Sequence, residues 1–124
     1  MSEYLTVIEV LSIHALMIEE FGGAEGIRDL GALEAAVFRP ETGYYTGPVE
    51  EAAALMESLL QNHPFLDGNK RTAFGAADLH LRLNGLHYSG TPAQAMAFID
   101  ALFEEQTVDA SLIATWLSDH ATPL

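Results

Sequence analysis

The stretch HPFLDGNKRTAF, residues 63–74, decides the fold prediction, because it interrupts two apolar runs with helical periodicity. Pro64 cannot continue the helix before it, and Gly68 permits a tight turn just before the next helix. The same stretch places two of the chain's five positive side chains, Lys70 and Arg71, next to each other. It is therefore predicted to be a short loop that leads into the N-terminus of a helix.

The rest of the chain is divided by Gly, Pro and Asn into segments with helical rather than alternating periodicity. Thr6 and Thr91 are predicted N-caps, and residues 86–90 are expected to form a short extended piece. The predicted helical segments are residues 6–21, 31–38, 49–63, 69–85, 91–106 and 109–120, with 69–85 as the buried central helix. The sequence therefore predicts an all-α fold, one compact domain over 1–124 with about six helices.

Composition excludes several classes of function. The chain has 124 residues, no cysteine and a formal net charge of -13, so it has no thiolate site and repels a nucleic-acid backbone at long range. No apolar stretch approaches the ~20 residues that cross a bilayer, and no export signal is expected at the N-terminus. We therefore expect a cytoplasmic protein that binds neither nucleic acid nor a membrane.

The loop carries the residue types of a phosphate site. The first turn of a helix presents free backbone N–H groups and partial positive charge, so Gly68 and Asn69 offer an anion-binding turn. Lys70 and Arg71 add full positive charges that suit phosphate oxygens. Asp67 supplies one carboxylate for Mg²⁺, which typically keeps few protein ligands beside phosphates.

A general base completes the set. His63 titrates near pH ~6.5 when unperturbed, so it can accept a proton from a hydroxyl nucleophile. Structural alternatives remain open for each residue, because Asp67, Gly68 and Asn69 also suit a turn with a helix cap, and His63 also suits the end of a helix.

The motif HPFLDGNKRTA closely resembles the signature of the Fic/Doc superfamily, and its lysine resembles the Doc branch of toxins from toxin–antitoxin pairs. Residues 22–45 are similar to the stretch upstream of the motif in Doc-like toxins. The resemblance implies the all-helical Fic/Doc fold, with ATP and Mg²⁺ as cofactors. It also implies His63 as general base, Asp67 as magnesium ligand, and Arg71 as phosphate clamp, with Gly68, Asn69 and Lys70 in the anion-binding turn.

The resemblance further implies a kinase that delivers the γ-phosphoryl group of ATP to a threonine of elongation factor Tu, halts translation, and is neutralised by a Phd-like antitoxin. Lys70 and Phe74 replace a glycine and an arginine of the adenylylating branch, whereas Gly68 resembles that branch. Two alternatives therefore stay open, an adenylyltransferase acting on a protein hydroxyl and a non-catalytic nucleotide-binding module.

Other polar and aromatic residues receive weaker predictions. Residues 41–47 are expected to be a target-docking flap by position, and Tyr44 and Tyr45 either contact a target or pack on their own loop. The four remaining histidines are not expected to take part in catalysis; they are His14, His80, His87 and His120.

Overall fold

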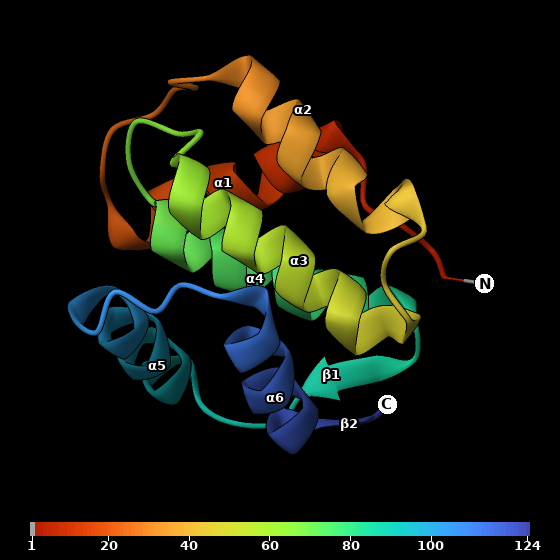
Figure 1. Cartoon of the computed structure of the whole chain (residues 1–124). Helices are drawn as coiled ribbons and strands as arrows, with labels where there is room; N and C mark the ends of the chain where they lie inside the picture. Colours follow the sequence, from red (N-terminus) through yellow and green to blue (C-terminus); the bar gives the residue numbers. More distant parts are fainter. Residues whose placement is uncertain (1) are drawn as a thin grey trace.

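A computed structural model describes residues 2–124 and confirms the all-α class. Within these residues the chain forms six α-helices, one 3-10 turn and two short strands (Figure 1). The helices are α1 (Val7–Phe21), α2 (Leu30–Phe38), α3 (Gly47–Asn62), α4 (Asn69–Leu83), α5 (Pro92–Glu104) and α6 (Ala110–His120), and η1 (Arg39–Thr42) follows α2. None of these helices is long and apolar enough to cross a membrane.

The helices begin where capping side chains satisfy free backbone donors. Thr6 accepts a hydrogen bond from the backbone N–H of Glu9, whose carboxylate binds back to the Thr6 N–H. Thr91 and Gln94 form the same reciprocal pair at α5. Such capping boxes stabilise the first turn of a helix, so both predicted N-caps are confirmed.

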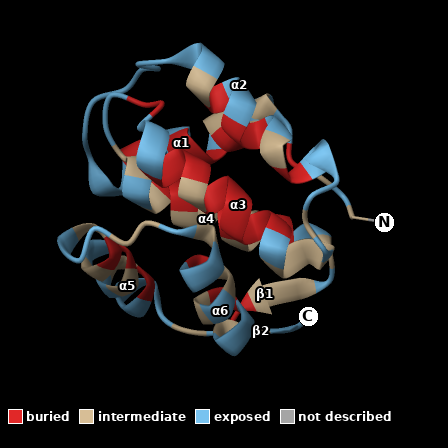
Figure 2. Cartoon of the chain, viewed as in Figure 1, coloured by how far each residue is buried: buried red, intermediate tan, exposed pale blue. Residues whose placement is uncertain are grey.

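The central helix of the fold is α3, not the predicted 69–85 helix. Nine of the 16 residues of α3 are buried, against six of the 15 residues of α4. The reason is that α3 packs against α2, α4, α6 and η1, and Figure 2 shows most of the α3 ribbon in the red that marks buried residues. The small residues of α4 still allow close packing, because a Cβ at Gly75 would lie 2.9 Å from the Met17 Cε of α1.

Two short strands tie the C-terminal end of the chain to α4. Strand β1 (Leu86–Tyr88) pairs antiparallel with β2 (Ala121–Pro123). The extended piece at 86–90 was therefore predicted correctly in part, but its partner was not predicted. Three residues of β2 carry too little alternation to be recognised as a strand without the strand that they pair with.

The loop that holds the motif lies at one end of the α3–α4 pair. Residues 22–29, which connect α1 to α2, run beside this loop, as Figure 1 shows. Residues 41–47 lie at the opposite end of α3, whose 16 residues span about 24 Å at 1.5 Å per residue. Residues 41–47 therefore lie away from the motif, and their expected role as a target-docking flap stays a prediction.

Candidate active site

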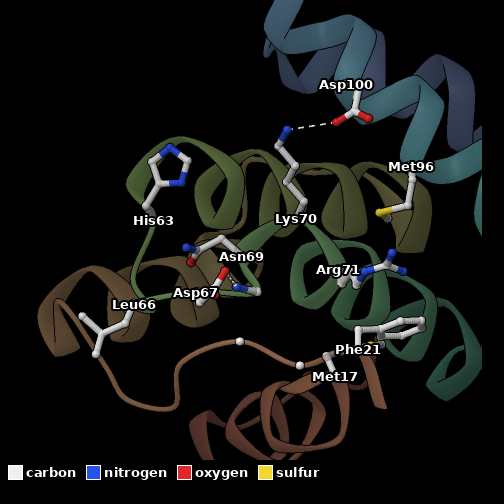
Figure 3. Close-up of a pocket in the computed structure, with 13 residues that line it drawn as sticks. Met17, Phe21, His63, Leu66, Asp67, Asn69, Lys70, Arg71, Met96 and Asp100 are labelled. Atoms are coloured by element: carbon white, nitrogen blue, oxygen red, sulfur yellow. Dashed lines mark hydrogen bonds and ion pairs between the residues drawn. The ribbon is translucent and has the colours of Figure 1, made fainter. Parts of the chain in front are cut away.

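A cavity of about 600 Å³ opens at the motif end of the molecule (Figure 3). Its wall is formed by the end of α1, the motif loop, the first turn of α4 and one face of α5. All six motif residues with predicted roles line it: His63, Asp67, Gly68, Asn69, Lys70 and Arg71. The fold therefore gathers the proposed base, carboxylate and anion-binding groups around one space.

Two residues in the left-handed backbone region delimit the motif loop. His63 ends α3 with φ 44° and ψ 60°, and Gly68 precedes α4 with φ 76° and ψ 16°. A left-handed conformation costs a residue with a side chain roughly 1–2 kcal/mol, so His63 needs support from its surroundings.

Arg28 supplies this support at the end of α3. Its Nε donates a hydrogen bond to the carbonyl of His63 at 2.6 Å, and its Nη2 donates to the carbonyl of Asn62. The last carbonyls of a helix have no partner inside the helix, so a guanidinium there satisfies two of them. Arg28 therefore fixes the backbone from which the candidate base projects.

The segment around Arg28 also pairs with the loop through its backbone. Ile27 and Phe65 form an isolated antiparallel bridge, and the Leu66 N–H donates to the carbonyl of Gly26 at 3.1 Å. The N–H groups of Arg28 and Asp29 both donate to the carbonyl of Pro64. This backbone pairing of residues 26–29 with the motif loop was not recognised from the sequence, because residues 26–29 show no alternating pattern of polar and apolar residues.

The side chain of Asn69 closes the loop on itself. Its Oδ1 accepts from the Phe65 N–H and its Nδ2 donates to the Phe65 carbonyl, both at 3.0 Å. Its amide is therefore already engaged within the loop, and its contribution to anion binding would come from the backbone. The first turn of α4 has no side-chain cap, so no capping side chain occupies its free backbone N–H groups at the end of the helix beside the cavity.

The two cationic side chains diverge from this helix end. Figure 3 shows Lys70 reaching toward α5, where its Nζ lies 2.9 Å from the Asp100 Oδ1. Arg71 lies on the other side, with its Cζ 3.8 Å from the centre of the Phe21 ring. A guanidinium over an aromatic face gains electrostatic attraction and a fixed orientation. The helix end therefore lies between two positively charged groups.

Asp67 is held at the entrance to α4 and remains exposed. Its Oδ1 accepts from the Gly68 N–H at 2.9 Å, and its Oδ2 accepts from the Ala24 N–H at 3.3 Å. Because a carboxylate oxygen has two lone pairs, each still has capacity for a cation. A Cβ at Gly23 would lie 2.7 Å from Oδ2, so a glycine is needed for this close approach.

The candidate base lies against α5. The ring of His63 stacks near Phe103, with ring centres 6.0 Å apart, and the residue is exposed. Phe103 also lies beneath the Lys70 ammonium, 4.9 Å from its ring centre. One aromatic side chain of α5 therefore contacts both groups, and no pattern in the sequence had marked it.

His14 is a second residue whose connection to the motif was not recognised from sequence. Its Nε2 lies 2.8 Å from the carbonyl oxygen of Asp67, and its ring stacks on Phe65 with centres 3.8 Å apart. It is buried, so it supports the loop from behind rather than facing the cavity. The prediction that His14 stays out of catalysis is compatible with this supporting position.

The remaining predicted residues lie elsewhere. Tyr45 packs on its own loop, where its hydroxyl accepts from Arg39 Nε at 2.7 Å, while Tyr44 is 86% exposed. His80 is buried between α3 and α4, and His87 belongs to β1. Within residues 2–124, no group of three or more His, Asp or Glu side chains is arranged to hold a metal.

Comparison with known proteins adds independent information. A family model described as Fic/DOC family matches residues 4–81. A protein named Toxin Doc from Mycolicibacterium smegmatis is 43% identical over 91 residues, which cover 69% of this chain and 68% of that protein. Protein kinase doc from Escherichia phage P1 is 31% identical over 106 residues, which cover 82% and 84% of the two chains.

Proposed function

This chain is a Doc-like member of the Fic/DOC family, and on that premise we propose that it is a toxin kinase that transfers the γ-phosphoryl group of ATP to a protein hydroxyl. The observation that carries the proposal is the joint presence of His63, Asp67 and the α4 N-terminus, with Lys70 and Arg71, around one cavity. Phosphoryl transfer depends mainly on positioning and charge, which these groups supply.

The phosphate chain of ATP is proposed to bind at the start of α4. Its oxygens would accept from the uncapped N–H groups there, beside the charges of Lys70 and Arg71. Gly68 keeps the approach free of a side chain, since it has none. The chain has a net charge of -13, and Lys70 and Arg71 are adjacent in its sequence. The start of α4 therefore offers a polyanion two neighbouring positive charges in an otherwise acidic protein.

The cavity suits a magnesium ion held chiefly by phosphate. Asp67 presents both carboxylate oxygens with remaining lone pairs at the cavity wall, which fits a cation that takes only one or two protein carboxylates. Mg²⁺ bound there would neutralise charge on the phosphates. We propose Asp67 as its protein ligand.

His63 is proposed to act as the general base. Its ring would take the proton of the target hydroxyl as that oxygen bonds to the γ-phosphorus, while the bond from the γ-phosphorus to its bridging oxygen breaks. ADP leaves with the bridging oxygen, and the target keeps the phosphoryl group. Arg71 and Lys70 would stabilise the negative charge of the reacting phosphates.

The target and the partner form the finer part of the proposal. We propose a threonine of elongation factor Tu as the acceptor, so that phosphorylation halts translation, and a Phd-like antitoxin as the neutralising partner. The names of the two relatives, Toxin Doc and Protein kinase doc, support a toxin with kinase activity, whereas the acceptor and the antitoxin are proposed from the family resemblance of the motif. A segment of the antitoxin that folds on binding would fit this kind of control.

Adenylyl transfer is the second candidate function. The sequence feature in its favour is Gly68, which resembles the adenylylating branch of the family. In the structure Gly68 has φ 76°, and a Cβ there would lie 3.1 Å from the Ile18 Cδ1. Local packing is therefore a sufficient reason for this glycine. Phe74, which stands in place of an arginine of adenylylating members, packs edge-on against Tyr88 with centres 5.0 Å apart. Phe74 therefore supplies no positive charge at the position where adenylylating members have an arginine.

Labelling with ATP that carries the isotope at the γ or the α position separates the candidates. Purified elongation factor Tu and a bacterial lysate serve as acceptors, and the variants are His63→Ala and, as a control for loss of a histidine, His87→Ala. The proposal expects γ label in protein with wild type and His87→Ala, and none with His63→Ala. Transfer of α label would establish an adenylyltransferase, and transfer of neither label would favour a binding module.

A further inference from the structure

The two cations of the cavity have different partners. The guanidinium of Arg71 lies over the ring of Phe21, and among residues 2–124 it forms no ion pair. The ammonium of Lys70 forms an ion pair with Asp100 at 2.9 Å. The charge of Lys70 is therefore balanced before any ligand arrives, whereas that of Arg71 is available to an incoming anion.

Asp100 belongs to the wall of the same cavity. It lies on α5, and Figure 3 shows its carboxylate meeting Lys70 from the side opposite Phe21 and Met17. A carboxylate is an unexpected neighbour for a phosphate site, because it repels the phosphates that the site is built to hold. Its position therefore calls for a role connected with Lys70.

The ion pair is suited to opening. The side chains of Lys70 and Asp100 are 45% and 56% exposed, and ion pairs in contact with water are weak and screened by salt. The Lys70 ammonium also rests over the ring of Phe103, 4.9 Å from its centre. Lysine is a compact charge on a flexible stem, so it can leave this place for a phosphate oxygen at low cost.

We propose that the ion pair of Asp100 with Lys70 is an electrostatic latch on nucleotide binding. Asp100 holds Lys70 against α5 in the free protein, and an entering polyphosphate must separate Lys70 from Asp100 in order to bind it. This inference rests on the proposed function, since it concerns the same phosphate site. Asp100 opposes the nucleotide in two ways, by occupying the lysine and by adding negative charge beside the phosphates. Asp100 is thus a positioning residue that lowers the affinity for ATP.

Calorimetric titration with ATP and Mg²⁺ tests the latch without requiring phosphoryl transfer. The variants are Asp100→Asn, Lys70→Met and the double variant, with Glu104→Gln as a control. Glu104 is an exposed acid on the same helix that does not line the cavity. Glu104→Gln therefore removes one negative charge, as Asp100→Asn does, but removes it away from the phosphate site. Thermal unfolding checks that each variant folds.

The latch predicts that Asp100→Asn binds ATP about two- to five-fold more tightly than wild type, the range expected for an exposed ion pair. The gain should be smaller in the Lys70→Met background, shrink in 0.5 M salt, and exceed that of Glu104→Gln. Unchanged or weaker binding by Asp100→Asn, or an equal gain with and without Lys70, overturns the latch alone. Failure of wild type and every variant to bind ATP overturns the proposed function and the latch together.

Discussion

The Nε2 atom of His14 lies 2.8 Å from the backbone carbonyl oxygen of Asp67, although 53 positions separate the two residues. Because a carbonyl only accepts hydrogen bonds, Nε2 must carry the ring proton in this contact. The contact joins α1 to the residue that supplies the carboxylate of the cavity. The motif loop is therefore held from behind by a helix that precedes it by a third of the chain.

The first prediction concerns this contact. His14→Phe keeps an aromatic ring over Phe65 but loses the donor to Asp67, so the free energy of unfolding should fall by about 1 kcal/mol. Phosphoryl transfer should fall by about ten-fold or more, since small displacements of a reacting group are costly. His87→Phe, which removes a histidine from β1, is the control, and a transfer rate that matches the control would contradict the supporting role.

The second prediction uses two adjacent glycines. Gly22 and Gly23 have φ of 83° and 117°, but a Cβ would meet nothing within 4 Å at Gly22 and would meet Asp67 Oδ2 at 2.7 Å at Gly23. Both alanine variants carry the cost of a positive φ, and Gly23→Ala also displaces the carboxylate. Gly23→Ala should raise the Mg²⁺ concentration needed for half-maximal transfer, while Gly22→Ala should not. A similar Mg²⁺ requirement in the two variants would argue against Asp67 as the ligand.

The third prediction concerns the support of His63. Arg28→Gln removes the guanidinium that binds the carbonyls of His63 and Asn62, and hydrogen bonds to charged groups contribute about 1.5–3 kcal/mol. We expect that loss in chemical denaturation, with a larger relative loss in the transfer rate because the proposed base, His63, is no longer positioned. Arg82→Gln removes an exposed i,i+4 ion pair with Asp78 and should change stability by about 0.5 kcal/mol or less. Equal effects of the two variants would show that Arg28 has no special relation to the motif.

The sequence was sufficient for the elements of the site but not for their supports. The helix boundaries around the motif follow from local chemistry, since Pro64 and Gly68 act through their own backbones, and the predicted anion-binding turn lies where α4 begins. The family resemblance assigned roles to the motif residues, and the structure places these residues around one cavity.

The supports escaped prediction because they are long-range contacts of residues with no distinctive pattern. Arg28 lies in an irregular segment, and only folding brings it to the end of α3. Asp100 is an ordinary charged position on an amphipathic helix until α5 packs beside Lys70. The choice of central helix was wrong for a similar reason, since burial of α3 results from packing on several sides.

The last prediction concerns the buried pair between α3 and α4. His80 Nε2 lies 3.2 Å from Glu51 Oε1, the residues are 1% and 4% exposed, and the Tyr4 hydroxyl donates to the other carboxylate oxygen at 3.3 Å. Burial lowers the pKa of His80 below its usual value despite the opposing influence of Glu51. The neutral ring therefore donates from Nε2, and its buried Nδ1 needs no acceptor, although it would need one if protonated.

The sign of the pH dependence follows from this lowered pKa. As the pH falls below 6.5, His80 binds a proton in the unfolded chain but not yet in the folded protein, whose His80 has a lower pKa. The free energy of unfolding is therefore highest above pH 6.5 and decreases as the pH falls from 6.5 to the pKa of the folded protein. Wild type should therefore lose more free energy of unfolding between pH 7.5 and 5.5 than His80→Gln, as measured by urea denaturation at both values. His87→Gln retains the buried pair and should keep the wild-type loss. An equal loss in wild type and His80→Gln would mean that His80 binds a proton as readily in the folded protein as in the unfolded chain.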